Sequence, residues 1–266
     1  MSDEKAKIPG QTGAPEKPKF PTEVVDLPSK GLLYPEGHAL SNGTVELKYM
    51  TAREEDILSS ANLIRKGLVI DELLKSLVVS DVNFDDILVG DKNAIMVNAR
   101  IFGYGKQYKS DVTCPKCGKV EKDCDFDLTS IGYKEIDEKL CNRKNEFEYE
   151  LPNSKRKIVF KMLTQADEVA ITKDIEAVAK HVNNVTPEVT TRLRYQIKSV
   201  DGNEDKTFIN NFIQNEFFAV DSRAFREYYA KVQPDVELEF LFGCGSCGEQ
   251  SIADVPITVN FFWPSQ

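Results

Sequence analysis

Apolar and polar residues first alternate regularly at residues 45–50, a pattern typical of a half-buried strand. Thr51 and Glu54 follow at the spacing of a capping box, in which the Thr hydroxyl and the Glu carboxylate satisfy amide groups left free at a helix start. The apolar spacing beyond them predicts helices over 52–66, 70–78 and 92–102, the last with Asp91 as its N-cap. The pattern therefore indicates an α+β fold.

A similar order of elements returns in the second half of the chain, where residues 158–168 align with residues 45–55. The matching polar positions are Lys48 with Lys161, Thr51 with Thr164, and Glu55 with Glu168. Residues 221–225 then align with 91–95, and the same alignment carries one cysteine pair onto another without a gap. We interpret this as two related strand–helix units produced by internal duplication; a chance similarity of two α+β segments is the alternative.

Four of the six cysteines form two CxxC pairs, CPKCG at 114–118 and CGSCG at 244–248. Each pair places two sulfurs on one tight turn, and the following glycine lets backbone amides point at them, which lowers the thiol pKa and favours a tetrahedral metal. We expect a zinc-ribbon-like module that joins the two units, with one structural Zn²⁺ bound by Cys114, Cys117, Cys244 and Cys247. Four thiolates fill the coordination shell of zinc and leave no position for a catalytic water.

Other interpretations of the cysteines are weaker. A redox CxxC usually starts a helix after a strand, whereas both pairs lie between strand-like segments. Residues 243–248 also match GxGxxG, but the extended segment 251–256 ends in proline and offers no helix N-terminus for a pyrophosphate. Cys124 and Cys141 could complete a local site with the first pair, but they lack its spacing, so we expect buried free thiols.

Composition and motifs argue against an enzyme. The 266 residues include 34 Lys+Arg, 43 Asp+Glu and two His, with a net charge of -9. His38 and His181 lie in unrelated contexts and are expected to be surface or packing residues, and the sequence contains no P-loop, GxSxG or HExxH motif. We predict no catalytic residues and no small-molecule substrate.

A zinc-ribbon nucleic-acid-binding protein is the alternative function, because zinc ribbons often bind nucleic acids. Lysines surround the first cysteine pair, whereas the charged residue next to the second pair is Glu249, which is acidic. The acidic net charge also opposes a surface that follows phosphates. We therefore rank nucleic acid low among the partners.

The two ends of the chain have compositions of their own. The first residues are rich in Pro, Gly and charged side chains, which predicts a flexible arm over 1–23, followed by a first unit over 24–144 and a second over 145–266. Phe261, Phe262 and Trp263 predict a C-terminal aromatic strand, packed in the core or used as an anchor for a partner. No apolar run reaches the ~18 residues of a membrane span and no apolar signal core opens the chain, so we expect a cytoplasmic protein without membrane partners.

Several short motifs, taken in order, resemble one known family. They are PSKGLLYP at 28–35, MTAREEDIL at 50–58, GDKNA at 90–94, GYG at 103–105, CPKCG, SVDG at 199–202, DSRA at 221–224, CGSCG and FFWP at 261–264. Over residues 24–264 the chain is similar to the baseplate hub assembly proteins of T-even-like contractile-tailed bacteriophages.

This resemblance implies a non-enzymatic role in building the tail baseplate hub, as an assembly factor or a minor hub subunit. It implies other phage baseplate hub proteins as partners, and the cytoplasm of the infected bacterium or the virion baseplate as the location. Members of the family vary in their cysteine pairs, so the zinc prediction rests on the cysteines of this chain.

Overall fold

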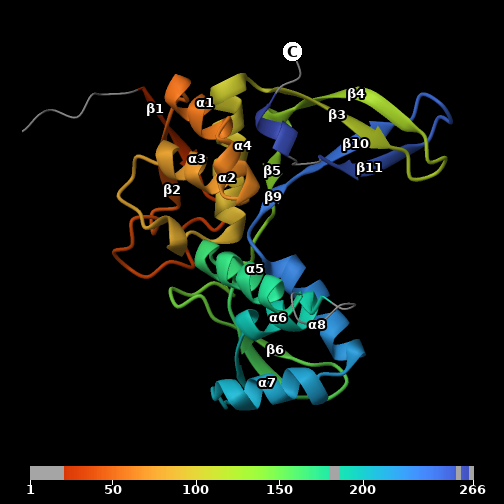
Figure 1. The fold of residues 1–266 in the computed structure, drawn as a ribbon. Helices are drawn as coiled ribbons and strands as arrows, with labels where there is room; N and C mark the ends of the chain where they lie inside the picture. The colour runs from red at the N-terminus through yellow and green to blue at the C-terminus, as the bar shows by residue number, and fades with distance from the viewer. Residues whose placement is uncertain (1–20, 180–185, 256–258, 264–266) are drawn as a thin grey trace, which may run out of the picture.

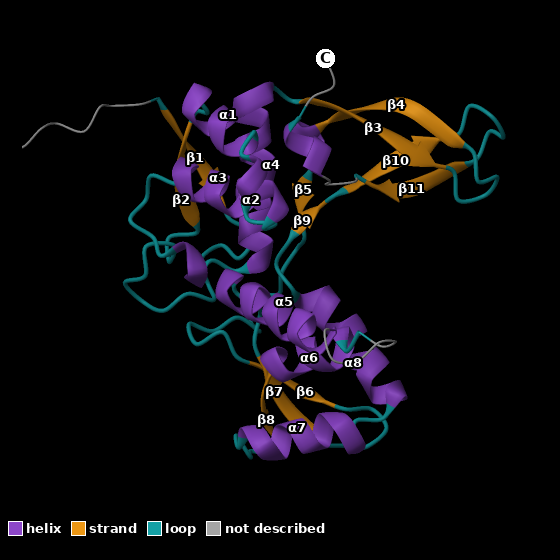
Figure 2. Ribbon diagram, in the orientation of Figure 1, coloured by secondary structure: helices purple, strands orange, loops and turns teal. Residues whose placement is uncertain are grey.

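The computed structural model describes residues 21–179, 186–255 and 259–263, and it mixes helices and strands in three parts (Figures 1 and 2). We call the elements from β1 to α4 the first body and those from β6 to α8 the second body. The two β-hairpins β3–β4 and β10–β11 form the hairpin arm. Figure 1 shows the arm beside the first body, with the second body below. None of the described helices is long and apolar enough to cross a membrane.

The first body packs four helices against a two-stranded sheet. Its elements are β1 (Thr22–Asp26), β2 (Thr44–Lys48), α1 (Ala52–Leu58), α2 (Ala61–Arg65), α3 (Val69–Leu77), the 3₁₀ turn η1 (Phe84–Asp86) and α4 (Val89–Tyr104). β1 and β2 are antiparallel, with Val25 opposite Val45, and both side chains are buried. Leu73, Leu74 and Leu77 of α3 are fully buried as well, as the apolar spacing predicts.

The predicted continuous helix over 52–66 is wrong at its middle, because the chain forms two helices there. Ser60 lies between them in an extended conformation and is the N-cap of α2. The Ser59 hydroxyl donates to the Asp56 carbonyl (3.2 Å), and serine favours helix ends over helix interiors because it bonds to nearby backbone groups, which accounts for the break at the Ser59-Ser60 pair.

The prediction of Asp91 as an N-cap is also wrong. Leu88 caps α4, and Asp91 lies inside its first turn, fully buried. Its carboxylate accepts the backbone N–H of Ser29 (2.9 Å), the Ser29 hydroxyl (2.7 Å) and the Tyr34 hydroxyl (2.7 Å). Burial raises the pKa of Asp91, against the effect of these hydrogen bonds. The carboxylate therefore fixes the loop after β1 to α4 instead of capping its own helix.

The second body places helices around a three-stranded antiparallel sheet. Its elements are β6 (Phe147–Glu150), β7 (Lys157–Phe160), α5 (Gln165–Ala179), α6 (Glu188–Gln196), β8 (Ile197–Val200), α7 (Lys206–Asn215) and α8 (Ala219–Val232), with sheet order β6-β7-β8. Phe160 on the central strand packs against Phe225, Tyr228 and Tyr229 of α8. An aromatic cluster thus holds the sheet to α8.

The hairpin arm combines segments far apart in the chain. It contains β3 (Gln107–Thr113), β4 (Val120–Asp127), β10 (Glu239–Gly243) and β11 (Gln250–Asp254). The turn η2 (Leu128–Ser130) follows β4, and the short strands β5 (Gly132–Tyr133) and β9 (Val236–Glu237) pair antiparallel between arm and second body. The chain therefore leaves the arm through β5, builds the second body and returns through β9 (Figure 1).

The predicted capping box of α1 is confirmed. The Glu54 carboxylate accepts the backbone N–H of Thr51 (2.9 Å) and its hydroxyl (2.7 Å), and it pairs with Lys48 at 2.8 Å. Burial alone would raise the pKa of Glu54, but the hydrogen bonds from Lys48 and Thr51 outweigh it and lower the pKa to about 2. The fold therefore favours the ionised form of this carboxylate.

Replacing Glu54 by glutamine is expected to destabilise the protein at neutral pH by roughly 2 kcal/mol. Because the folded-state pKa is lowered, the stabilisation is present above the unfolded pKa near 4.5 and is lost as the pH falls toward 2. Chemical unfolding between pH 7 and pH 3 should show a flatter acid dependence in the variant. Glu55→Gln, at an exposed neighbouring position, is the control; an equal change in both variants would contradict the assignment.

The same contacts recur at the start of α5. The Asp167 carboxylate accepts the Thr164 backbone N–H (2.9 Å) and hydroxyl (3.1 Å), and it pairs with Lys161 at 2.7 Å. Buried Asp221, in the first turn of α8, accepts the backbone N–H groups of Asn153 (2.8 Å) and Ser154 (3.0 Å). Each body thus has a lysine–carboxylate cap and a buried aspartate that holds a loop, as a duplicated unit would; the duplication itself stays a prediction.

Candidate metal centre

The four predicted metal ligands lie at the end of the hairpin arm. Cys114 and Cys117 are in the turn between β3 and β4, and Cys244 and Cys247 are in the turn between β10 and β11. The two hairpins pack through their inner faces, where the rings of Phe126 and Phe240 lie edge to face with centroids 4.2 Å apart. This aromatic contact packs the two hairpins on each other at the end opposite the turns, and the turns lie close together as well.

The two turns have the same backbone geometry. The Cys114 N–H donates to the Lys119 carbonyl (2.8 Å), and the Gly118 N–H donates to the Cys114 carbonyl (3.0 Å). In the second turn Cys244 donates to Glu249 (2.8 Å) and Gly248 to Cys244 (2.9 Å). Gly118 and Gly248 have φ values of 70° and 72°, a left-handed conformation that favours glycine. The glycine after each second cysteine is therefore needed to form the turn.

The sulfur atoms of the four cysteines lie within 4.8 Å of one another. The Sγ atoms of Cys114 and Cys247 are 3.7 Å apart, and those of Cys117 and Cys244 are 3.8 Å apart. Thiolates bound at ~2.3 Å around a tetrahedral Zn²⁺ are about 3.8 Å from each other. The donor set and its spacing therefore fit a four-coordinate metal site, with Cys114 and Cys244 buried and their partners exposed.

The surroundings affect the two buried thiols differently. A hydrogen bond from the Cys117 backbone N–H is the main cause that lowers the pKa of Cys114 to about 7. Burial raises the pKa of Cys244 to about 12. A bound cation would let both be thiolates, because metal binding displaces thiol protons. Lys116 and Glu249, one from each turn, form a 2.6 Å ion pair across the two turns.

Comparison with known proteins identifies the family. The model of the T4 bacteriophage base plate protein family matches residues 21–263. The chain belongs to this family. Searches of the curated proteins and of the solved structures found no significant match. The match extends over both bodies and the hairpin arm.

The two remaining cysteines of the baseplate protein lie outside the four-sulfur cluster and are half-buried. The Cys124 thiol donates to the Glu121 carbonyl and the Cys141 thiol to the Asp137 carbonyl, both at 3.6 Å. Burial raises the pKa of both thiols, which favours their protonated form. Neither completes a local site with the first pair within the described part of the chain.

The predicted C-terminal aromatic strand is wrong in its conformation. Residues Val259–Phe262 form the 3₁₀ helix η3, and Phe261 and Phe262 are buried in the core. The Phe261 carbonyl accepts a hydrogen bond from Arg100 Nε (2.7 Å) instead of pairing with a strand, and its ring packs edge-on against Tyr108. The core position is thus confirmed for these two residues, and an apolar run of this length does not distinguish the two conformations.

Sequence reasoning missed Arg100, a buried residue of α4. Besides the Phe261 carbonyl, its guanidinium donates to the carbonyls of Gly105 (2.7 Å) and Gln107 (3.0 Å). It therefore joins the end of α4, the start of β3 and the C-terminal segment at the base of the arm. The available signal was a single charged side chain in the mostly apolar stretch 94–104, because a buried arginine is rarely without partners.

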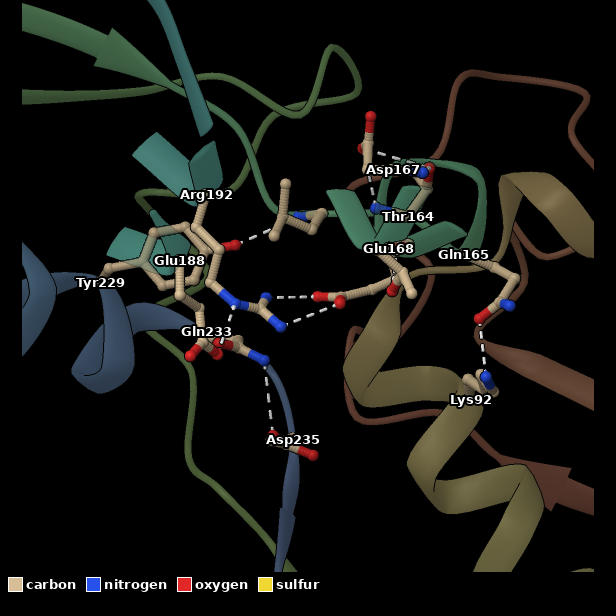
Figure 3. Close-up of polar contacts among 12 residues, drawn as sticks. Lys92, Thr164, Gln165, Asp167, Glu168, Glu188, Arg192, Tyr229, Gln233 and Asp235 are labelled. Atoms are coloured by element: carbon tan, nitrogen blue, oxygen red, sulfur yellow. Dashed lines mark hydrogen bonds and ion pairs between the residues drawn. The ribbon is translucent and has the colours of Figure 1, made fainter. Parts of the chain in front are cut away.

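A polar cleft of about 530 Å³ lies between the first and second bodies of the baseplate protein (Figure 3). Lys92 on α4 contacts Asp71 (2.6 Å) and Gln165 (2.7 Å), and Arg192 on α6 binds both oxygens of Glu168 (2.7 and 3.0 Å). Each charged side chain that lines the cleft already has a partner of opposite charge. We interpret the cleft as a polar joint between the bodies.

The remaining sequence motifs fit this structure. The GxGxxG match at 243–248 leads into strand β11, so no helix follows it. His38 stacks on Tyr34 with ring centroids 4.8 Å apart, and its Nδ1 accepts the Leu40 N–H, as expected of a packing residue. His181 and most of the predicted N-terminal arm lie outside the described residues, while Thr22 and Glu23 belong to β1.

Proposed function

We propose that this baseplate protein is a non-enzymatic assembly factor or minor subunit of the tail baseplate hub, and that it acts by binding other hub proteins. The observation that carries the proposal is the family match over residues 21–263. The site we describe offers a structural role, because four thiols that surround a metal leave no position for a substrate or a catalytic water. The proposed locations are the cytoplasm of the infected bacterium and the virion baseplate.

In this proposal a structural Zn²⁺ is held by Cys114, Cys117, Cys244 and Cys247 in a zinc-ribbon-like arm. Cys117 and Cys244 are 127 positions apart in the chain. A metal between them would close the long segment that contains the second body, and closing a long loop restricts the unfolded chain. The zinc would thus hold the two hairpins together at the end of the arm, and the chain on both sides of the second body would be joined into one scaffold for partners.

Purification of the protein from infected cells tests the hub role. Other hub proteins of the same phage should co-purify, and their identity can be established by mass spectrometry. Presence in finished particles would indicate a minor subunit, whereas presence only in assembly intermediates would indicate an assembly factor. Co-purification with no baseplate protein, from either fraction, would contradict the proposal.

The alternative, a zinc-ribbon nucleic-acid-binding protein, has less support from charge. The second hairpin belongs to a stretch, residues 234–266, that contains no Lys, Arg or His. Phosphate binding depends on such cations and weakens steeply with salt. Salt-dependent retention on DNA or RNA at low ionic strength would favour this alternative, and absence of retention would remove it.

A further inference from the structure

The outer face of the β10–β11 hairpin carries an exposed apolar pair. Leu241 lies directly opposite Ile252 in the antiparallel register, and the two residues are 73% and 69% exposed. Side chains alternate along a strand, so these two point away from the inner face, where Phe242 is buried and Phe240 packs on Phe126. Two large aliphatic side chains therefore sit side by side in solvent on a two-stranded sheet.

The same face carries two carboxylates in an unfavourable arrangement. Glu239 lies directly opposite Asp254, two residues along each strand from the apolar pair, and both carboxylates are exposed. Like charges at directly opposed positions destabilise a sheet. Neither carboxylate has an ion pair within the described chain, and residues 234–266 supply no cation of their own. The hairpin is thus suited to a cation from outside.

We propose that Glu239, Leu241, Ile252 and Asp254, the acidic apolar face, bind a segment of another baseplate protein in which an apolar side chain lies next to Lys or Arg. The apolar pair would be removed from water, and the basic side chain would neutralise the facing carboxylates. This inference rests on the proposed function for the class of partner, and it adds where on this chain the partner binds and by what chemistry.

Charge also argues against a second copy of the chain as the occupant. Two acidic apolar faces brought together would place four carboxylates in one contact, and like charges in an interface oppose association. A basic partner relieves this repulsion, so the face is more suited to a different protein.

Site-specific photo-crosslinking in infected cells tests the proposal on the full chain. We place p-benzoylphenylalanine at position 241, irradiate cells infected with the phage that encodes the protein, and identify adducts by mass spectrometry. The expected adduct joins position 241 to a baseplate protein at a segment where an apolar residue neighbours Lys or Arg. The variant E239K/D254K in the same background should reduce the adduct by about tenfold or more, because a central contact then carries repelling charge.

Two controls match the exposure and the charge change. The crosslinker at Val79, 50% exposed on the first body, should not give this adduct, and E36K/D81K, at two exposed carboxylates of the first body, should leave the adduct at position 241 unchanged. If circular dichroism shows that E239K/D254K does not fold, E239Q/D254Q takes its place, with a reduction of severalfold expected.

Three kinds of adduct would overturn the proposal: adducts to a second copy of the chain, adducts to host proteins only, and adducts to acidic segments. The absence of any adduct would also overturn it, as would an adduct that the charge-reversed variant still forms. Deletion of the gene separates this failure from failure of the hub role. If baseplates do not assemble after deletion but position 241 gives no adduct, the docking face is wrong and the hub role stands. If the adduct forms but deletion leaves assembly intact, the docking face stands and the assembly role is wrong.

Discussion

Serine in place of both Cys244 and Cys247 is expected to lower the zinc content from about one ion per chain to none. The double substitution removes two of the four thiolates and leaves only Cys114 and Cys117 as ligands. Serine is a poor replacement, because zinc prefers thiolate to hydroxyl ligands. Structural zinc contributes ~10 kcal/mol in small peptides. In this protein only part of that free energy would be lost from the stability of the fold, because the hairpins also pack through Phe126 and Phe240 without the metal. We expect a loss of several kcal/mol.

Metal analysis of the purified protein and thermal unfolding measure this effect, and hydrogen exchange should show opening of β3, β4, β10 and β11 before the second body. The double variant Cys124→Ser, Cys141→Ser is the control, since both thiols lie outside the cluster. Its zinc content should equal that of the unchanged protein. Carefully purified protein without zinc, or equal metal loss in both variants, would contradict the site.

The features that the sequence predicted well depend on local signals. The CxxC turns, the Thr51–Glu54 cap and the apolar face of α3 each need only neighbouring residues, and the structure contains all of them. The proximity of the two cysteine turns is a long-range feature, but it could be predicted because a half-site of two thiols is incomplete without another pair.

The features that sequence reasoning missed depend on partners far away in the chain. Asp91 has the sequence context of an N-cap, but its hydrogen-bond donors are 57 and 62 positions away. Arg100 binds a carbonyl 161 positions away. The strands β5 and β9 have two residues each, too short for any periodic signal, although they decide that the second body lies between the two hairpins. Only the folded chain brings these groups together.

Gly90→Ala is expected to destabilise the protein by about 3 kcal/mol, as severe overpacking does. A Cβ at Gly90 would lie 1.8 Å from the Pro234 carbonyl oxygen and 2.7 Å from its carbon, and both are backbone atoms that cannot rotate away. Helix propensity alone would favour alanine over glycine by ~1 kcal/mol, so the sign of the measured change separates the two effects. Chemical unfolding of the full chain measures it.

The position matters because the segment before β9 crosses the first turn of α4 there, where Asn93 also donates to Asp235 at 2.9 Å. Val220 stands at the aligned position of the second body, 66% exposed, so that helix start tolerates a large side chain that α4 excludes. Gly243→Ala is the matched control: a Cβ there meets nothing within 4 Å, and we expect a change within about 0.5 kcal/mol. Because the close approach holds the returning chain against the first body, Gly90→Ala should also speed hydrogen exchange in β5 and β9. A stabilised Gly90→Ala protein would show that the two segments do not touch.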